Sequence, residues 1–340
     1  MYINTARKVM EEFGKPGLDD GELIFNDSRC KPHSFNIDNF HKIQKNDSKI
    51  KIAFIDGGNC EIFSSSSAAV HFIRIYFNIF SGQKKVKSSK IEFYSAVFPK
   101  IINQKIVYKT KLFPLDDSFI PFMPEEKDLE FEAMDATLRD GIFMTDISKA
   151  ASIARQFAEW AIIDLVLQNL DANDIIIRDG SLITGVTNEA AYFENAYRKL
   201  RKKEIHLGGL VKKTTLLTTT GKNFLSVMKE RGNKLVPNSS WYYYPLADIS
   251  LPEPAEMSII KLHPRSDFVF RFERIKGHGS MKDILSHIAE NSSDYRFPGY
   301  PYGLIDADRS ARVSEAERKF HKTLFPVFEN AHDILDRVFR

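Results

Sequence analysis

Several features that define large classes of protein are scarce or missing in this sequence. Two cysteines stand among 340 residues, Cys30 and Cys60, and they make neither a disulfide framework nor the spacing of a zinc site. None of the apolar runs reaches the ~18 residues of a membrane span. No apolar core of a signal peptide follows the basic residues near the start. We therefore expect a cytoplasmic protein that has no membrane partner.

The sequence also lacks internal repeats, low-complexity tracts and flexible linkers. Its hydrophobic content of 43% and charged content of 27% are ordinary for a globular protein, and its length allows a large core. A GxxxxGK[ST] phosphate loop is absent, so the sequence shows no nucleotide-driven motor. We expect one elaborated α/β domain over residues 1–340.

Apolar periodicity predicts a mixture of strands and helices. The first strands have hairpin-like spacing, which favours an antiparallel meander with a basic turn at 81–90. The acidic, proline-bearing segment 113–143 is predicted to be an irregular excursion. A long amphipathic helix follows it, because Thr145 or Asp146 can cap its start. We predict strands at 51–56, 68–80, 91–98, 105–112, 175–179, 205–217 and 267–273, and helices at 2–14, 37–46, 145–170, 188–203, 280–290 and 308–339.

The most informative pattern is a pair of Asp-Gly motifs, each at the end of an apolar run. The first is Asp56-Gly57 and the second is Asp179-Gly180. Each is typical of a buried strand that delivers a carboxylate and then turns on glycine, whose missing Cβ lets a metal ion or phosphate come close. Carboxylates at the ends of neighbouring strands can hold Mg²⁺ or Mn²⁺, which prefer oxygen ligands. The alternative for each is a turn-forming Asp before Gly.

The order of the elements points to a third carboxylate. A strand with Asp, a meander, a helix and a strand with a second Asp is the order of a ribonuclease H-like core, a mixed sheet flanked by helices. Such a core needs a carboxylate from the helix, and Glu159 is the candidate. Its alternative role is an i,i+4 ion pair with Arg155. Glu130 and Glu132 compete for the same role from the excursion.

Two further positions complete the predicted site. A fourth carboxylate often comes from a late helix, and Asp308 is the candidate with Asp306 as its competitor. Both stand at the predicted start of the last helix, where an acid in the first turn is the alternative role. Lys212 directly follows an apolar run and could point into the site.

Positive charge is concentrated in one segment, although the net charge is only +3. Residues 198–234 hold eleven lysines and arginines and two acids, so this segment carries +9 and the rest of the chain −6. A solvated helix face is one interpretation, but basic residues beside a metal site suit a polyanion. The aromatic run 241–244 could stack unpaired bases or pack in the core. The predicted nucleic-acid contacts are Arg198, Arg201, Lys202, Lys203, Lys212 and Lys213.

Taken in order, four motifs resemble the NurA nucleases, archaeal and bacterial enzymes that process DNA ends. The motifs are Ile55-Asp56-Gly57-Gly58, Arg178-Asp179-Gly180-Ser181-Leu182, Gly209-Leu210-Val211-Lys212, and Gly299-Tyr300-Pro301-Tyr302 followed by Ala307-Asp308. The resemblance covers about residues 50–315, the expected catalytic core. It implies a ribonuclease H-like fold with terminal helical additions, Mn²⁺-dependent DNA cleavage in double-strand-break repair, a homodimer, and a hexameric HerA-type ATPase as partner.

The sequence departs from this family in three places. Asp-Gly-Gly-Asn replaces the commoner Asp-Gly-Ser in the first motif, and Gly303 stands where a proline is expected. Asp308 stands where several relatives carry histidine. Because both residue types can bind Mn²⁺, the third departure bears on metal preference more than on activity.

The leading hypothesis is a nuclease with two Mn²⁺ or Mg²⁺ ions. Its catalytic residues would be Asp56, Glu159, Asp179 and Asp308 as metal ligands, with Lys212 beside them. An ATPase or kinase of the sugar-kinase type is the first alternative, but the sequence offers no second glycine-rich phosphate loop and no adenosine-binding Gly-Gly segment. A non-catalytic DNA-binding clamp is the second alternative, and a full set of carboxylates argues against it.

Overall fold

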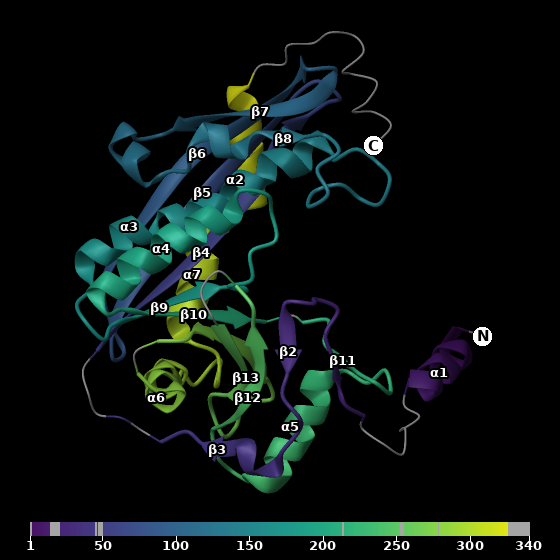
Figure 1. Cartoon of the computed structure of the whole chain (residues 1–340), viewed down its shortest axis with the longest axis vertical. Helices are drawn as coiled ribbons and strands as arrows, with labels where there is room; N and C mark the ends of the chain where they lie inside the picture. The colour runs from purple at the N-terminus through teal and green to yellow at the C-terminus, as the bar shows by residue number, and fades with distance from the viewer. Residues whose placement is uncertain are drawn as a thin grey trace.

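The computed structural model describes residues 2–13, 21–44, 46, 50–212, 214–251, 255–277 and 279–325 (Figure 1). The strands are β1 (Leu23–Ile24), β2 (Cys30–Pro32), β3 (Phe40–Lys42), β4 (Lys51–Ser64), β5 (Ala69–Ser81), β6 (Lys84–Ile102), β7 (Lys105–Pro114), β8 (Phe131–Glu132), β9 (Ile175–Asp179), β10 (His206–Val211), β11 (Leu217–Thr218), β12 (Trp241–Ile249), β13 (Ala255–Lys261) and β14 (Phe270–Ile275). The helices are α1 (Tyr2–Phe13), α2 (Ile147–Ala161), α3 (Ile163–Val166), α4 (Glu189–Lys203), α5 (Phe224–Leu235), α6 (Met281–Asn291), α7 (Tyr302–Ala311) and α8 (Glu315–Leu324), with 3₁₀ turns η1 (Ile37–Asn39), η2 (Asp117–Phe122), η3 (Glu126–Leu129) and η4 (Leu167–Asn169).

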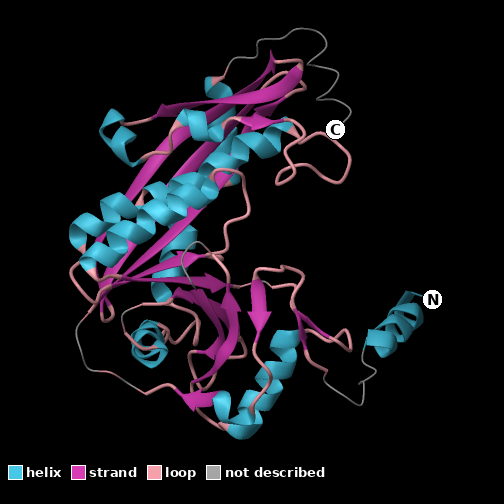
Figure 2. Ribbon diagram, in the orientation of Figure 1, coloured by secondary structure: helices cyan, strands magenta, loops and turns pink. Residues whose placement is uncertain are grey.

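One mixed sheet joins both halves of the molecule. Its order is β2-β12-β13-β14-β10-β9-β4-β5-β6-β7-β8, and β3 also pairs with β12. Strand β9 is parallel to both of its neighbours, β4 and β10, whereas the other described pairs in this sheet are antiparallel. Helices lie along this sheet (Figure 2). The predicted fold class, a mixed sheet flanked by helices, is therefore confirmed, and the single domain over residues 1–340 stays a prediction.

Successive residues of the central strand β4 pack in two different cores, one on each face of the sheet. Ile55 packs in the cluster that includes residues of α2 and α4, whereas Phe54 packs in the cluster that includes residues of α6 and α7. Side chains of a strand alternate between the two faces of a sheet, and both faces of β4 are covered by helices. This alternation decides which face of the sheet each functional side chain reaches.

The predicted meander and the second Asp strand agree closely with the structure. β9 spans the predicted residues 175–179, and β4, β5, β6 and β7 form the antiparallel series. The basic segment 81–90 differs, because β6 already begins at Lys84. The lysines of this segment are exposed, and lysine is common on an exposed strand edge as well as in a turn. The predicted helix 145–170 is broken into α2, α3 and η4.

Two strands that pair with each other, β12 and β13, were not among those predicted from the sequence. The aromatic run at 241–244 begins β12, where Trp241 and Tyr243 are fully buried in a core cluster. Of the two interpretations of this run, core packing is therefore the correct one for these side chains. The predicted helix 37–46 is also wrong, since the described residues of this segment form a 3₁₀ turn and β3 but no α-helix.

The last predicted helix, 308–339, is wrong at its start. Two helices stand there instead, and residues 326–339 lie outside the described part of the chain. Ser314 and Glu317 form a capping box that starts α8, a signal that the periodicity alone did not resolve. Asp308 consequently lies in the last turn of α7, not in the first turn of a longer helix.

Glycine at position 303 lets α7 lie directly on β4. A Cβ atom there would come within 2.0 Å of the ring of Phe54. The proline that the resemblance led us to expect would meet the same obstacle. The close approach of α7 to the sheet brings Asp308, about one and a half turns further along the helix, toward the strand ends.

We expect Gly303→Ala to lower the free energy of unfolding by about 1–3 kcal/mol, because the methyl group overpacks the contact with Phe54. Alanine is otherwise the better helix former by ~1 kcal/mol, so a net loss shows that the steric term is larger. Chemical denaturation measures the change. Gly277→Ala is the matched control, since nothing lies within 4 Å of its added Cβ. Equal or higher stability of Gly303→Ala would contradict this account of α7.

Candidate metal centre

Parallel pairing of β4 with β9 brings the two Asp-Gly motifs together. Ile55 is the register partner of Arg178, so Asp56 and Asp179 come next on adjacent strands. Two residues earlier, Phe54 and Ile177 both belong to the core beneath α6 and α7. The period of two in a strand therefore places both aspartates on the α7 face of the sheet.

Helix α7 supplies a third carboxylate to the same place. One oxygen each of Asp56, Asp179 and Asp308 lies within 4.8 Å of the others. Asp306 does not join them. Its carboxylate accepts hydrogen bonds from Asn78 at 2.8 Å and from Lys85 at 2.9 Å. Of the two candidates near the C-terminus, the structure thus brings Asp308 to the cluster.

Burial and mutual repulsion destabilise the charged form of the carboxylates in this cluster. Burial, together with the charges of Asp179 and Glu159, raises the pKa of Asp56 to about 8. Burial also raises the pKa of Asp179, against the opposing effect of Lys212. Three carboxylates at this separation form an all-oxygen donor set that fits a hard divalent cation.

Lys212 lies where the sequence suggested, directly after β10. Its Nζ is 2.5 Å from Oδ2 of Asp179 and 3.7 Å from Oδ1 of Asp308. It also lies 5.1 Å from the ring centre of Tyr300. One ammonium group thus links two of the three carboxylates, and about a third of this side chain remains exposed.

Sequence reasoning gave no role to Tyr300, although its motif was part of the family resemblance. Its hydroxyl is buried and has no hydrogen-bond partner among the described residues. Burial raises the pKa of this phenol, and the charges of Asp179, Asp56 and Asp308 raise it further. Tyr300 therefore stays protonated beside the cluster and has a donor free.

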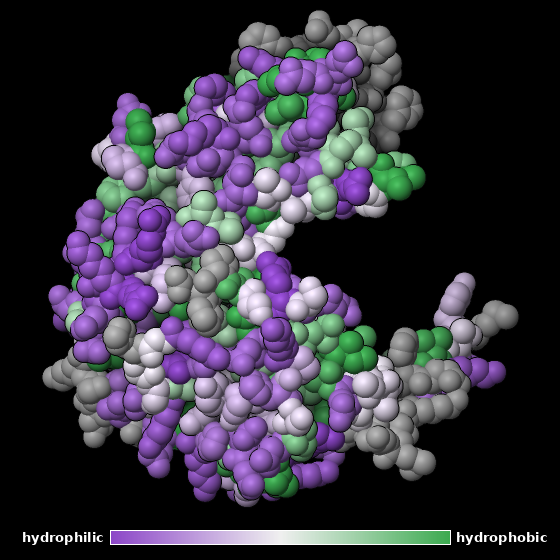
Figure 3. All heavy atoms as spheres, viewed as in Figure 1, coloured by the Kyte–Doolittle hydropathy of each residue, from purple (hydrophilic) through white to green (hydrophobic). Residues whose placement is uncertain are grey.

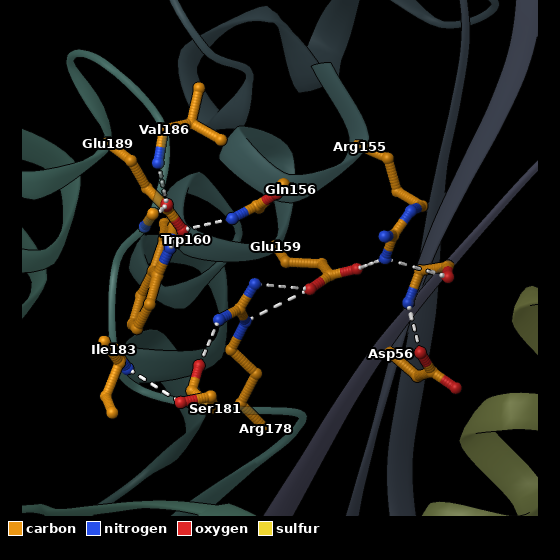
Figure 4. Close-up of polar contacts among 12 residues, drawn as sticks. Asp56, Arg155, Gln156, Glu159, Trp160, Arg178, Ser181, Ile183, Val186 and Glu189 are labelled. Carbon is orange, nitrogen blue, oxygen red and sulfur yellow. Dashed lines mark hydrogen bonds and ion pairs between the residues drawn. The ribbon is translucent and has the colours of Figure 1, made fainter. Parts of the chain in front are cut away.

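Glu159 lies behind the cluster, between two guanidinium groups (Figure 4). Arg178 donates to Oε2 through Nε at 3.1 Å and Nη2 at 2.8 Å, and Arg155 contacts Oε1. The ion pair with Arg155, its alternative role, is present. Glu159 nevertheless acts on the cluster, since its charge raises the pKa of both Asp56 and Asp179.

The turn after Asp179 is fixed from two sides. Nη1 of Arg178 donates to the carbonyl of Ser181 at 2.8 Å, and its guanidinium lies 4.4 Å from the ring centre of Trp160. Glu273 accepts hydrogen bonds from the Ser181 hydroxyl at 2.8 Å and the Leu182 amide at 2.7 Å. The two competitors from the excursion, Glu130 and Glu132, pair instead with lysines of β7.

Most of the predicted nucleic-acid contacts lie away from the carboxylates. The last turn of α4 carries Arg201, Lys202 and Lys203, all exposed, and Arg198 precedes them by one turn. β10 begins three residues later at His206, which pairs with Ile175, four positions before Asp179. The end of α4 is thus ~13 Å along the strands from the carboxylates. Of the predicted basic contacts, only Lys212 is seen to reach them, and Lys213 lies outside the described residues.

The molecule is hollowed on one side (Figure 3). Strands β9 and β10 end on that side of the molecule (Figure 1). The hollow separates the half built on β5 to β8 from the half that contains β12 and β13. A long polymer could therefore approach the strand ends that carry the cluster.

Comparison with known proteins decides the family. The sequence model of the NurA domain matches residues 50–313. The chain belongs to the NurA family. The matched region holds all the motifs on which the resemblance was based, and it includes Asp56, Asp179 and Asp308. Family membership and the fold together support a nuclease.

One solved structure shows the same fold at low sequence identity, and a second is a weaker match. The NurA nuclease from Sulfolobus solfataricus is 12% identical, with a TM-score of 0.52, and the match covers 85% of this chain and 86% of that one. The catalytic domain of human Endonuclease V is 10% identical, with a TM-score of 0.40 and coverage of 82% and 85%. A comparison with curated protein sequences gave no significant match. Among the described residues of this NurA chain, no helix has the length and apolarity needed to cross a membrane.

We expect Asp56→Asn to stabilise the metal-free protein more at high pH than at low pH. The pKa of Asp56 is about 8 in the folded protein and near 4 when unfolded, so the folded state binds the extra proton between these values. Stability therefore falls as the pH rises from about 4 to 8, and asparagine removes that loss. The gain should be ~1–3 kcal/mol at pH 8.5 and near zero at pH 4, because one pKa unit corresponds to ~1.4 kcal/mol and relaxation absorbs part of it.

Denaturation in EDTA at several pH values measures this effect. Asp306→Asn is the control. The carboxylate of Asp306 is paired with Lys85 and Asn78, so this variant should be less stable than the wild type. A gain for Asp56→Asn that does not change with pH would contradict the raised pKa.

Proposed function

We propose that this chain is a divalent-metal-dependent nuclease that cleaves DNA at or near its ends. The observation that carries the proposal is the convergence of Asp56, Asp179 and Asp308 from β4, β9 and α7, with oxygens within 4.8 Å. Family membership supports it, and the neighbour from Sulfolobus solfataricus is itself described as a nuclease. A cluster with this arrangement suits hydrolysis of a phosphodiester better than a structural role, because it raises the pKa of its own buried members.

Mn²⁺ or Mg²⁺, as two ions, is the proposed cofactor. Asp56, Asp179 and Asp308 would hold it, and Glu159 would join them where one of its oxygens leaves Arg155. Bound there, a divalent ion would supply an activated water and would neutralise charge on the phosphate. Because the three converging ligands are all carboxylates, the site accommodates Mg²⁺ as readily as Mn²⁺.

The chain's own residues have distinct tasks in this proposal. Asp56 must lose its proton for the site to load, so metal affinity should rise toward pH 8. Lys212 orients Asp179 and Asp308 and supplies positive charge beside them. Tyr300 keeps its proton and can donate a hydrogen bond to a phosphate oxygen or to water at the cluster.

Replacing either strand-end aspartate should abolish cleavage without unfolding the protein. We expect Asp56→Asn and Asp179→Asn each to lower the rate by at least ~100-fold, since losing even a residue that supports a ligand costs 10–100-fold. A labelled DNA assay with Mn²⁺, Mg²⁺ or EDTA measures this rate, and EDTA should stop the wild type. Asp306→Asn is the control and should keep its activity. Near-wild-type cleavage by both aspartate variants would overturn the metal-centre assignment.

We further propose that the protein works as a homodimer with a hexameric HerA-type ATPase in double-strand-break repair. The family supports these partners, and the absence of a phosphate loop from the sequence leaves DNA translocation to another protein. Light scattering should give about twice the 39.0 kDa mass of the chain. A monomer that processes DNA ends fully without an ATPase would contradict both partners.

A further inference from the structure

Two arginines serve a single buried carboxylate behind the metal centre. Glu159 is 1% exposed and contacts both Arg178 and Arg155. Arg178 alone makes a two-pronged pair with Oε2, and its side chain is 7% exposed. One arginine is enough to neutralise one carboxylate, so the charge of Arg155 exceeds what Glu159 requires.

Arg155 differs from Arg178 in being accessible. Its side chain is 33% exposed. Its Nη1 lies 3.4 Å from the carbonyl of Gly57, the residue directly after Asp56. A Cβ at position 57 would come within 2.9 Å of Cγ of Arg155, so glycine there allows the arginine to lie against the strand. Arg155 thus approaches the metal centre from α2, whereas Lys212 approaches it from the end of β10.

The charge of the loaded site calls for an anion. The four carboxylates face three cationic side chains, Arg155, Arg178 and Lys212, if the exposed Arg312 paired with Asp308 is left aside. That leaves one negative charge. One divalent cation would turn it into one positive charge, and the two proposed ions would turn it into three. A partly exposed guanidinium in such a site binds a phosphate well, because its planar donors match two phosphate oxygens.

We propose that Arg155 contacts the substrate by binding a backbone phosphate of the DNA at the metal centre, opposite Lys212. This inference rests on the proposed function and adds to it a residue that no motif pointed out. Arg155 exchanges its contact with Glu159 for the phosphate, while Arg178 keeps Glu159 neutralised. Arg178 is a positioning residue, since it holds Glu159 and the turn after Asp179 from a buried place.

The experiment measures DNA binding as a function of salt. Binding of a short fluorescent single-stranded oligonucleotide is followed by anisotropy in Ca²⁺, which loads the site, and in EDTA. Arg155→Met should weaken binding in Ca²⁺ about tenfold, the value of one charged hydrogen bond. It should lower the slope of log K against log salt by ~0.7, the contribution of one phosphate contact on a single strand.

Arg318→Met is a closely matched control. The Arg318 side chain is 35% exposed, pairs with Glu315 at i,i+3, and donates to the carbonyl of Glu61 on the same strand β4. It therefore has the same kinds of contact as Arg155 at a place away from the carboxylates. Its replacement should leave both the affinity and the slope unchanged.

A second variant, Arg155→Lys, tests whether weaker DNA binding by Arg155→Met comes from loss of folding. Lysine keeps the charge but not the two-pronged geometry, so this variant should keep the slope while binding less tightly. An unchanged slope for Arg155→Met, or an equal change for Arg318→Met, overturns the role of Arg155. If Arg155→Met does not fold, an Arg155→Lys variant with wild-type affinity overturns it as well. A wild type that cleaves no DNA would instead overturn the proposed function, so the two failures are distinguishable.

Discussion

Repulsion among three carboxylates is the constraint on which the site depends. Asp56, Asp179 and Asp308 lie on separate elements, and nothing local in the chain holds them together. Parallel pairing of β4 with β9 fixes the first two, and packing of α7 on Phe54 fixes the third. These contacts lie in the buried cores, where rearrangement is costly. The free energy of core packing therefore keeps the charges close. The raised pKa of Asp56 reflects first its burial and then its repulsion by Asp179 and Glu159.

Consecutive residues of β9 serve two layers of the same centre. Side chains alternate across a sheet, so Asp179 faces α7 and joins the carboxylates, whereas Arg178 faces α2 and pairs with Glu159. The sheet is thin enough for charges on its α2 face to act on those on its α7 face. This arrangement explains how Glu159 affects Asp56 without belonging to the group of three converging oxygens.

Those parts of the site that depend on local sequence could be predicted. A short apolar run that ends in Asp-Gly specified β9 to the residue, and the order of elements specified its neighbour β4. The break between α7 and α8 was not predicted, and the capping box of Ser314 and Glu317 is the local signal that marks it. The double pairing of Glu159 could not be read from spacing, since Arg178 becomes its neighbour only when β9 lies against α2. The distance of the basic end of α4 from the carboxylates likewise depends on chain direction, which charge counts do not contain.

The unequal lengths of β4 and β9 have a consequence for solubility. β9 stops at Asp179 and pairs with β4 only from Ile52 to Ile55, whereas β4 continues to Ser64. An unpaired stretch of strand can recruit a strand from another molecule and so start aggregation. Arginine side chains donate to this stretch, from Arg155 to the carbonyl of Gly57 and from Arg318 to that of Glu61. β9 ends where the carboxylates meet and so leaves this edge of β4 without a neighbouring strand. The two guanidinium groups shield that edge.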